Sequence, residues 1–311
     1  MAKMMKNENG YHIPVLLNSS IEGLNIVPEG VYVDVTFGGG GHSRKILNSL
    51  GKNGKLFAFD QDTEAHENAF EDSRFKLIDQ NFAFIKNYLA FHGIEKVDGI
   101  LADLGVSSHQ FDSGERGFSI RYEGELDMRM NQNQGLTAKQ VVNDYEEDKL
   151  EFIFKAYADI RNAKLVARKI VEARNEQVIE TTTQLIEVVK LLTTFKKENQ
   201  FLAQIFQAIR IEVNQELEVL KQFLLAAKDL LNPGGRLVVI SYHSLEDRLV
   251  KNFIKKGKFE GEVEKDFYGN PLLELKDVAR KAIVPTNDEI ELNSRARSAK
   301  MRIAEKLKNN G

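Results

Sequence analysis

The sequence contains no cysteine, and this absence excludes several kinds of chemistry at once. Without cysteine there is no disulfide framework, no cysteine-based zinc or iron–sulfur centre and no cysteine nucleophile. A chain of this kind is compatible with the cytoplasm, which is the location that we expect. The sequence also has no apolar run near the ~20 residues of a membrane-spanning helix, and its polar start, residues 1–12, is unlike a secretory signal.

Neither sign of charge dominates the sequence. The 43 Lys and Arg residues are offset by 46 Asp and Glu residues, which gives a net charge of −3. The overall charge does not indicate a nucleic-acid-binding protein, so such a function would depend on local basic clusters. Most basic runs only form solvated surface, but three clusters together favour contacts with phosphate groups. They are residues 295–308, the set Arg161, Lys164 and Arg168 at helical spacing, and the set Lys251, Lys255, Lys256 and Lys258.

The six histidines show no spacing typical of metal ligands. The H-E-x-x-H pattern of zinc enzymes is absent, and the histidines are scattered along the chain. We therefore expect no protein-bound metal.

The first third of the 311-residue chain alternates between strand-like and helix-like segments. Short runs of apolar, β-branched and aromatic residues are each followed by a segment with helical periodicity. Such alternation with short connections is typical of a parallel, doubly wound α/β sheet. The expected strands are 31–37, 55–60, 75–78 and 97–103, and the expected helices are 42–50, 63–70 and 84–92.

Beyond residue 105 the strand pattern disappears and returns only near the end of the chain. Residues 105–135 have the composition of an ordered loop. A later helix ends near Leu231, before an Asn-Pro-Gly-Gly turn, and residues 237–241 again resemble a buried strand. We predict a doubly wound, mostly parallel sheet, residues 1–115 and 211–311, with an inserted all-helical domain, residues 116–210, whose helices are 138–143, 148–174, 183–192 and 200–209.

Four consecutive glycines, residues 38–41, lie between the first predicted strand and the helix that follows it. Ligands of parallel α/β sheets bind at the carboxyl ends of the strands. Glycine allows a ligand to approach the backbone there, and the free N–H groups of the next helix suit a negative group. The dinucleotide pattern G-x-G-x-x-G fails at Ser43, so the spacing alone does not identify the ligand.

Two carboxylates lie at the ends of predicted strands. Asp60 ends the second strand, where a carboxylate can accept hydrogen bonds from both ribose hydroxyls of an adenosine, although an exposed turn aspartate is the alternative. Asp103 ends the fourth strand and should lie beside the glycine turn, although a lone carboxylate there is often a turn or cap residue. These features fit either a nicotinamide dinucleotide or S-adenosylmethionine.

Seven short motifs, spread in one order over nearly the whole chain, add a resemblance to a known family. They are HIPVLL (12–17), TFGGGGHS (36–43), DLGVSS (103–108), ERGFS (115–119), LDMRM (126–130), SYHSLEDR (241–248) and SRARSAK (294–300). Together they resemble the small-subunit ribosomal RNA cytosine-N4 methyltransferases, the RsmH or MraW family. Each motif is weak alone, whereas the ordered set is highly specific. The family often has proline at the position of His109 and a larger residue at that of Gly39.

The resemblance implies a class I methyltransferase that uses S-adenosylmethionine as its methyl donor. Its substrate would be the exocyclic N4 amine of one cytidine in the decoding region of small-subunit (16S) ribosomal RNA. Its partner would be that RNA or the assembling small subunit, with no membrane involved. The helical insert would help to recognise RNA, and the chain would end in a basic tail. The oligomeric state is left open, with a homodimer among the alternatives.

The same resemblance implies roles for individual residues. The glycine turn and His42 would line the methionine end of the cofactor, Asp60 would hold the ribose, and Phe82 would lie against the adenine. Without the resemblance, Phe82 is equally well a core aromatic. The implied cofactor-binding residues are Gly40, Gly41, His42, Asp60, Phe82, Asp103 and Gln110.

The chemistry suggests which residues could face the target base. A cytosine amine is a poor nucleophile, so the enzyme must align it with the methyl group, and an acceptor near the amine can orient it and remove its proton. Asp103 is the candidate for this catalytic role, unless it only binds the cofactor. The base must also leave its stack. Tyr242 and His243 could flank it, if they are not simply a packed strand end, and Arg295 and Arg297 could contact the RNA.

Two other functions remain open at this stage. A nicotinamide-dependent oxidoreductase would satisfy the glycine turn and Asp60 and would retain NADH after purification. A non-catalytic ribosome-assembly factor would bind immature small subunits without transferring a methyl group.

Overall fold

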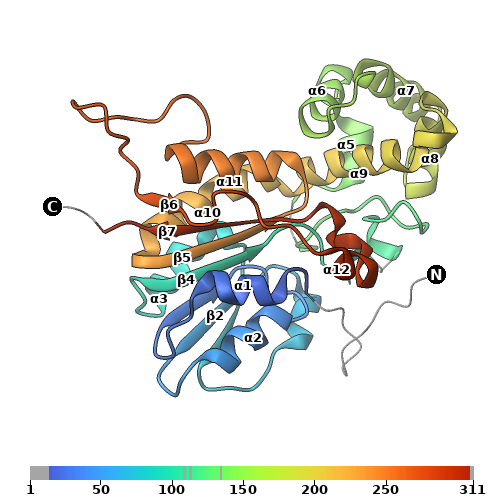
Figure 1. Ribbon diagram of the computed structural model, residues 1–311. Helices are drawn as coiled ribbons and strands as arrows, with labels where there is room; N and C mark the ends of the chain where they lie inside the picture. The colour runs from blue at the N-terminus through green and yellow to red at the C-terminus, as the bar shows by residue number, and fades with distance from the viewer. Residues whose placement is uncertain (1–13, 108–109, 112–113, 134, 309–311) are drawn as a thin grey trace. The chain divides into compact units, whose positions relative to one another are not determined.

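The computed structural model describes residues 14–107, 110–111, 114–133 and 135–308 (Figure 1). The chain divides into two compact units. The sheet unit comprises Met1–Gly105 and Glu218–Gly311, and the helical unit comprises Val106–Leu217. None of the helices in the described part of the chain is both long and apolar enough to span a bilayer.

The described residues of the sheet unit form a seven-stranded sheet in the order β3-β2-β1-β4-β5-β7-β6. Strands β1 to β5 pair in parallel, whereas β7 is antiparallel to both β5 and β6. The central strands are buried on both faces, as their continuous apolar runs predict. The strands are β1 (Val31–Asp34), β2 (Lys55–Asp60), β3 (Phe75–Asp79), β4 (Val97–Asp103), β5 (Leu231–Ser241), β6 (Leu275–Asp277) and β7 (Lys300–Lys306).

Helices cover both faces of this sheet, and each face has its own apolar core. Side chains of α1 and α2 pack on one face with Tyr32 and Leu56, while those of α3, α10 and α11 pack on the other with Val33 and Phe57. The predicted fold class, a doubly wound and mostly parallel sheet, is therefore confirmed. The elements are α1 (Leu17–Leu24), α2 (Gly41–Ser49), η1 (Thr63–Asn68), η2 (Phe82–Phe84), α3 (Ile85–Phe91), α10 (Glu216–Leu230), α11 (Ser244–Lys256), α12 (Asn287–Leu292) and η6 (Ser294–Ser298).

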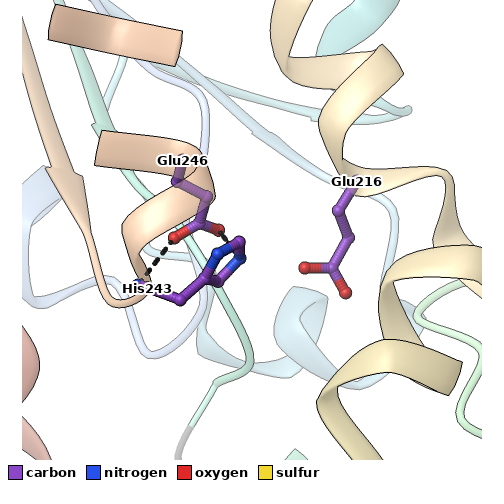
Figure 2. Close-up of side chains that lie close together, drawn as sticks. All are labelled: Glu216, His243 and Glu246. Atoms are coloured by element: carbon purple, nitrogen blue, oxygen red, sulfur yellow. Dashed lines mark hydrogen bonds and ion pairs between the residues drawn. The ribbon is translucent and has the colours of Figure 1, made fainter. Parts of the chain in front are cut away.

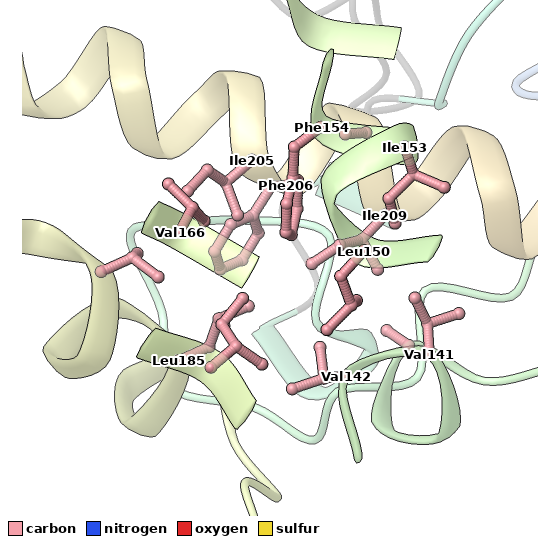
Figure 3. Packing of buried hydrophobic residues seen from close by; sticks show 14 of the residues in the cluster. Val141, Val142, Leu150, Ile153, Phe154, Val166, Leu185, Ile205, Phe206 and Ile209 are labelled. Atoms are coloured by element: carbon pink, nitrogen blue, oxygen red, sulfur yellow. The ribbon is translucent and has the colours of Figure 1, made fainter. Parts of the chain in front are cut away.

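The helical unit has a separate apolar core, shown in Figure 3. Phe154, Ile205 and Ile209 are buried in it, and capping boxes at Thr137 and Thr181 begin two of the helices. The elements are η3 (Gly114–Arg116), α5 (Ala138–Asp144), α6 (Glu147–Ala158), α7 (Ala163–Glu176), α8 (Thr182–Val189), η4 (Lys190–Leu192), η5 (Phe195–Lys197) and α9 (Glu198–Asn214).

The structure corrects the sequence analysis in two segments. The helix expected over residues 148–174 is two helices, because Asp159 adopts a left-handed conformation that ends α6. Residues 300–306 are not part of a basic tail but form β7 inside the sheet. Three basic side chains of β7 have acidic partners: Arg302 lies 2.6 Å and Lys300 3.8 Å from Asp247, and Lys306 lies 2.7 Å from Glu274.

Candidate functional site

The glycine turn begins where β1 reaches the carboxyl edge of the sheet. The backbone N–H of Val35 still bonds to the carbonyl of Leu101, at 2.9 Å, and that of Phe37 to the carbonyl of Phe59, at 3.0 Å. The chain then enters the left-handed region at Gly38 and Gly40, with φ angles of 51° and 71°. Glycine adopts this conformation without the steric penalty of a side chain, which explains both residues.

Gly41, the first residue of α2, is required for a different reason. A Cβ atom at this position would lie 2.3 Å from Cγ of Pro14. The N-terminus of α2 therefore lies directly against the segment that precedes α1. By contrast, a Cβ atom at Gly38 would meet none of the described atoms within 4 Å, so the space beside the turn is open there.

A buried carboxylate, Asp34, fixes the end of β1 to α2. Its side chain is fully buried and accepts hydrogen bonds from Ser43 Oγ at 2.7 Å and from the backbone N–H of Thr36 at 3.1 Å. Burial raises the pKa of Asp34, and these hydrogen bonds oppose the shift. The sequence around Asp34 does not indicate this role, because it depends on burial, which a short motif does not reveal.

Asp60 lies at the end of β2 and holds the glycine turn through hydrogen bonds. It accepts bonds from the backbone N–H groups of Gly38, at 2.8 Å, and Asp62, at 2.9 Å, one on each carboxylate oxygen. Burial raises the pKa of Asp60 to about 6, against the lowering effect of these bonds. A carboxylate has about four acceptor positions, so two remain for a ligand.

Asp103, at the end of β4, is held by residues from two other strand ends. Its backbone N–H donates to Thr36 Oγ1 at 2.7 Å, and its Oδ1 accepts a bond from the Tyr242 hydroxyl at 2.8 Å. Its Oδ2 lies 3.7 Å from Nδ1 of His42. The structure thus brings His42 and Asp103 together, as expected for strands β1 and β4 that lie side by side.

The electrostatic surroundings of Asp103 favour a carboxyl that holds its proton more tightly than usual. Burial is the main cause that raises its pKa to about 6, and the charges of Asp34 and Glu246 act in the same direction. His42 and the Tyr242 hydroxyl oppose the shift. Burial also lowers the pKa of His42, so this imidazole is mainly neutral near pH 7. The contact between the two side chains is therefore not a full ion pair.

Glu246 organises the segment after β5, shown in Figure 2. This buried carboxylate accepts hydrogen bonds from the backbone N–H groups of Tyr242, at 3.0 Å, and His243, at 3.3 Å, and lies 3.1 Å from His243 Nε2. The Glu246 side chain caps the start of α11 in this way. A Glu three residues after the cap position was visible in the sequence, but its role was missed. Contact of Tyr242 and His243 with a target base stays a prediction.

Phe82 follows β3 and is partly buried against the core of the sheet unit. Its ring meets that of Phe223 edge to face, with 5.3 Å between the centroids. The preceding residue, Asn81, donates to Gln61 Oε1 at 2.9 Å and so links the chain after β3 to the chain after β2. Phe82 thus lies at the same edge as Asp60, and its contact with an adenine remains a prediction.

The other predicted residues lie elsewhere in the chain. Gln110 belongs to the helical unit, where its Oε1 accepts a bond from the backbone N–H of Ser107 at 3.0 Å. Arg295 and Arg297 both lie on η6 of the sheet unit; Arg295 is half-buried and Arg297 is exposed. Their roles in binding cofactor and RNA remain predictions.

The fold and the site together define the class of protein. The strand order β3-β2-β1-β4-β5-β7-β6 with an antiparallel β7, together with the glycine turn after β1, is that of an α/β protein of the class I methyltransferase type. The chain belongs to the MraW methylase family, whose model matches residues 9–307.

Two relatives match over almost their whole length. The chain is 61% identical to the ribosomal RNA small subunit methyltransferase H of Flavobacterium johnsoniae, over 96% of this chain and 98% of the relative. It is 55% identical to the protein with the same name from Bacteroides thetaiotaomicron, over 97% of this chain and 100% of the relative.

Proposed function

We propose that the protein transfers a methyl group from S-adenosylmethionine to the exocyclic N4 amine of a cytidine in the decoding region of small-subunit (16S) ribosomal RNA. Membership of a methylase family supports methyl transfer, and the names of the relatives support ribosomal RNA as the substrate. The observation that carries the proposal is the meeting of the β1 and β4 ends, where Asp103 lies against His42 and Tyr242.

The residues at this edge of the sheet fit S-adenosylmethionine. When bound, this group supplies a methyl on a positively charged sulfur, which is a strong electrophile. Asp60 keeps acceptor positions for the two ribose hydroxyls, and the space beside Gly38 is open. In this proposal Gly40, Gly41 and His42 hold the methionine end, Phe82 contacts the adenine, and Asp103 and Gln110 complete the pocket.

Asp103 is proposed to orient the target amine and to accept the proton that it loses. The Tyr242 hydroxyl donates only one hydrogen bond to Asp103 Oδ1, and the Asp103 side chain is 21% exposed. Other acceptor positions of this carboxylate are therefore free for the amine. A pKa near 6 makes Asp103 a stronger base than an ordinary aspartate while leaving it mostly ionised at pH 7. Tyr242 fixes the direction in which this carboxylate points.

Recognition of the RNA is proposed to involve both units. Arg297 is exposed on η6, and the cluster of Arg161, Lys164 and Arg168 is exposed on and just before α7 of the helical unit. Basic and aromatic groups of this kind bind single-stranded RNA whose bases are unstacked. The protein would act on the assembling small subunit in the cytoplasm.

The decisive experiment combines labelled S-adenosylmethionine with small subunits from cells that lack this protein. Mapping the labelled nucleoside should locate one methyl group on N4 of a cytidine in the decoding region. A label on another atom or base would contradict the cytidine-N4 assignment. Binding to subunits without any transfer of label would instead indicate an assembly factor.

A further inference from the structure

An acidic segment with two exposed aromatic side chains lies between α11 and β6. We call residues 257–274 the aromatic arm; it can be followed in Figure 1 from the end of α11. At its tip, Phe267 is 97% exposed and Tyr268 is 86% exposed. Both rings thus lie almost wholly outside the core of their own unit.

The tip is nevertheless held in one conformation by hydrogen bonds. Asp266 Oδ1 accepts bonds from the backbone N–H groups of Tyr268, at 2.9 Å, and Asn270, at 2.8 Å. The N–H of Asp266 in turn donates to the carbonyl of Asn270 at 2.9 Å, which closes the turn. The two rings meet edge to face with 5.6 Å between their centroids.

The base of the arm is anchored to α11. The ring of Phe259 stacks on the buried Phe253, with 5.1 Å between centroids and 15° between the planes. Asn252 donates a hydrogen bond to the carbonyl of Phe259 at 3.0 Å. Lys258 and Glu264, 2.6 Å apart, then join the two sides of the arm. The arm therefore presents its aromatic tip from a fixed base.

Exposed aromatic side chains that are already ordered are suited to binding a macromolecule. Burial of each ring would remove a large apolar area from water, and little conformational freedom would be lost because the turn is already formed. Phe and Tyr are also enriched at the centres of protein interfaces.

The charge of the arm indicates the class of partner. Acidic residues outnumber basic ones: Glu264 pairs with Lys258, whereas Glu260 and Glu262 are exposed, and Lys265 is the second cation of the arm. The acidic side chains of the arm would repel phosphate groups and attract a positively charged protein surface. Proteins that bind ribosomal RNA carry such surfaces, because they neutralise phosphates with Lys and Arg.

We infer that the aromatic arm docks on a basic protein of the small ribosomal subunit, with Phe267 and Tyr268 filling an apolar pocket that has a basic rim. The inference rests on the proposed function only in taking the small subunit as the substrate particle. It assigns to the arm the recognition of a protein, separate from the methyl-transfer site and from the RNA.

The first test measures binding of the full-length protein to purified small subunits, without S-adenosylmethionine. The double variant Phe267→Ser, Tyr268→Ser should bind about tenfold or more weakly, as expected for loss of two central aromatic residues. The matched control is Phe91→Ser, since Phe91 is 83% exposed on α3 of the same unit. It should bind like the wild type. Equal binding by the double variant would overturn the inference.

The second test separates protein from RNA as the partner. Glu260→Lys combined with Glu262→Lys should weaken binding to subunits and leave binding to deproteinised ribosomal RNA no weaker. Tighter binding to intact subunits would contradict a basic protein partner. A photoreactive Phe267→p-benzoylphenylalanine variant should cross-link to a subunit protein, and a cross-link to RNA alone would overturn the inference. Because binding is measured without methyl donor, failure of the wild type to transfer methyl groups would refute only the proposed function.

Discussion

Asp103 is the residue at which the proposed chemistry can be tested most directly. Its side chain is held by Tyr242 and lies beside His42, and its pKa is raised to about 6 mainly by burial. Asp103→Ala should lower kcat at least about 100-fold, the usual contribution of general-base catalysis. S-adenosylmethionine affinity, measured by calorimetry, should fall much less than kcat. Parallel loss of affinity and turnover would show that Asp103 only binds the cofactor.

The pH dependence of methyl transfer should reflect the same carboxyl. Only ionised Asp103 can accept a proton, so kcat should fall as the pH drops through about 6. Tyr242 lowers the pKa of Asp103 by donating a hydrogen bond. Tyr242→Phe should therefore move this fall in kcat to higher pH. Tyr122→Phe, which changes a half-exposed tyrosine of the helical unit, should leave the profile unchanged. An unshifted profile for Tyr242→Phe would contradict its positioning role.

Asp60 should determine affinity rather than turnover. In Asp60→Ala the ribose hydroxyls would lose two hydrogen bonds to a carboxylate. This loss should weaken S-adenosylmethionine binding about 10- to 100-fold. Calorimetric titration would measure this loss. The matched control is Asp79→Ala, because the Asp79 side chain is 59% exposed at the end of the neighbouring strand β3. If both variants bind alike, Asp60 does not contact the ribose.

At the scale of the element, β7 shows how a basic motif can be structural. Arg302 is mostly buried, and its guanidinium lies 2.6 Å from Asp247 of α11, whereas Lys300 on the same strand is largely exposed. Arg302→Ala breaks a partly buried ion pair and should lower the free energy of unfolding by about 2 kcal/mol. Lys300→Ala should lower it by less than about 0.5 kcal/mol. Urea unfolding followed by circular dichroism would measure both. Equal stability of the two variants would show that the Arg302 pair contributes little.

The elements differ in how far the sequence predicts them. The bounds of β2 and β4 match the expected strands, because each is a short run of mainly apolar residues. Strand β7 mixes charged and apolar residues, so it lacks the continuous apolar run that marks β2 and β4. The break at Asp159 was missed because neither glycine nor proline marks it. Asp60 and Asp103 were found from their positions at strand ends, whereas the importance of Asp34 depends on burial.

At the scale of the whole molecule, the net charge of −3 makes RNA binding depend on local clusters. We expect affinity for ribosomal RNA to fall steeply with salt, because each phosphate contact releases a counterion. If Arg297 contacts a phosphate, Arg297→Ala should reduce the slope of log K against log salt concentration by about 1. Filter binding over a salt series would measure the slope. If the affinity of the wild type for ribosomal RNA does not change with salt concentration, the basic clusters do not contact its phosphates.

The helical unit occupies one continuous stretch of chain, whereas the sheet unit is assembled from two stretches on either side of it. During synthesis on the ribosome, all residues of the helical core have therefore emerged while the sheet still lacks β5, β6 and β7. Strand β7 follows every other strand of this sheet in sequence, yet it takes a place between β5 and β6. We therefore expect the helical unit to fold first, because the sheet cannot close until β7, Lys300–Lys306, has been synthesised.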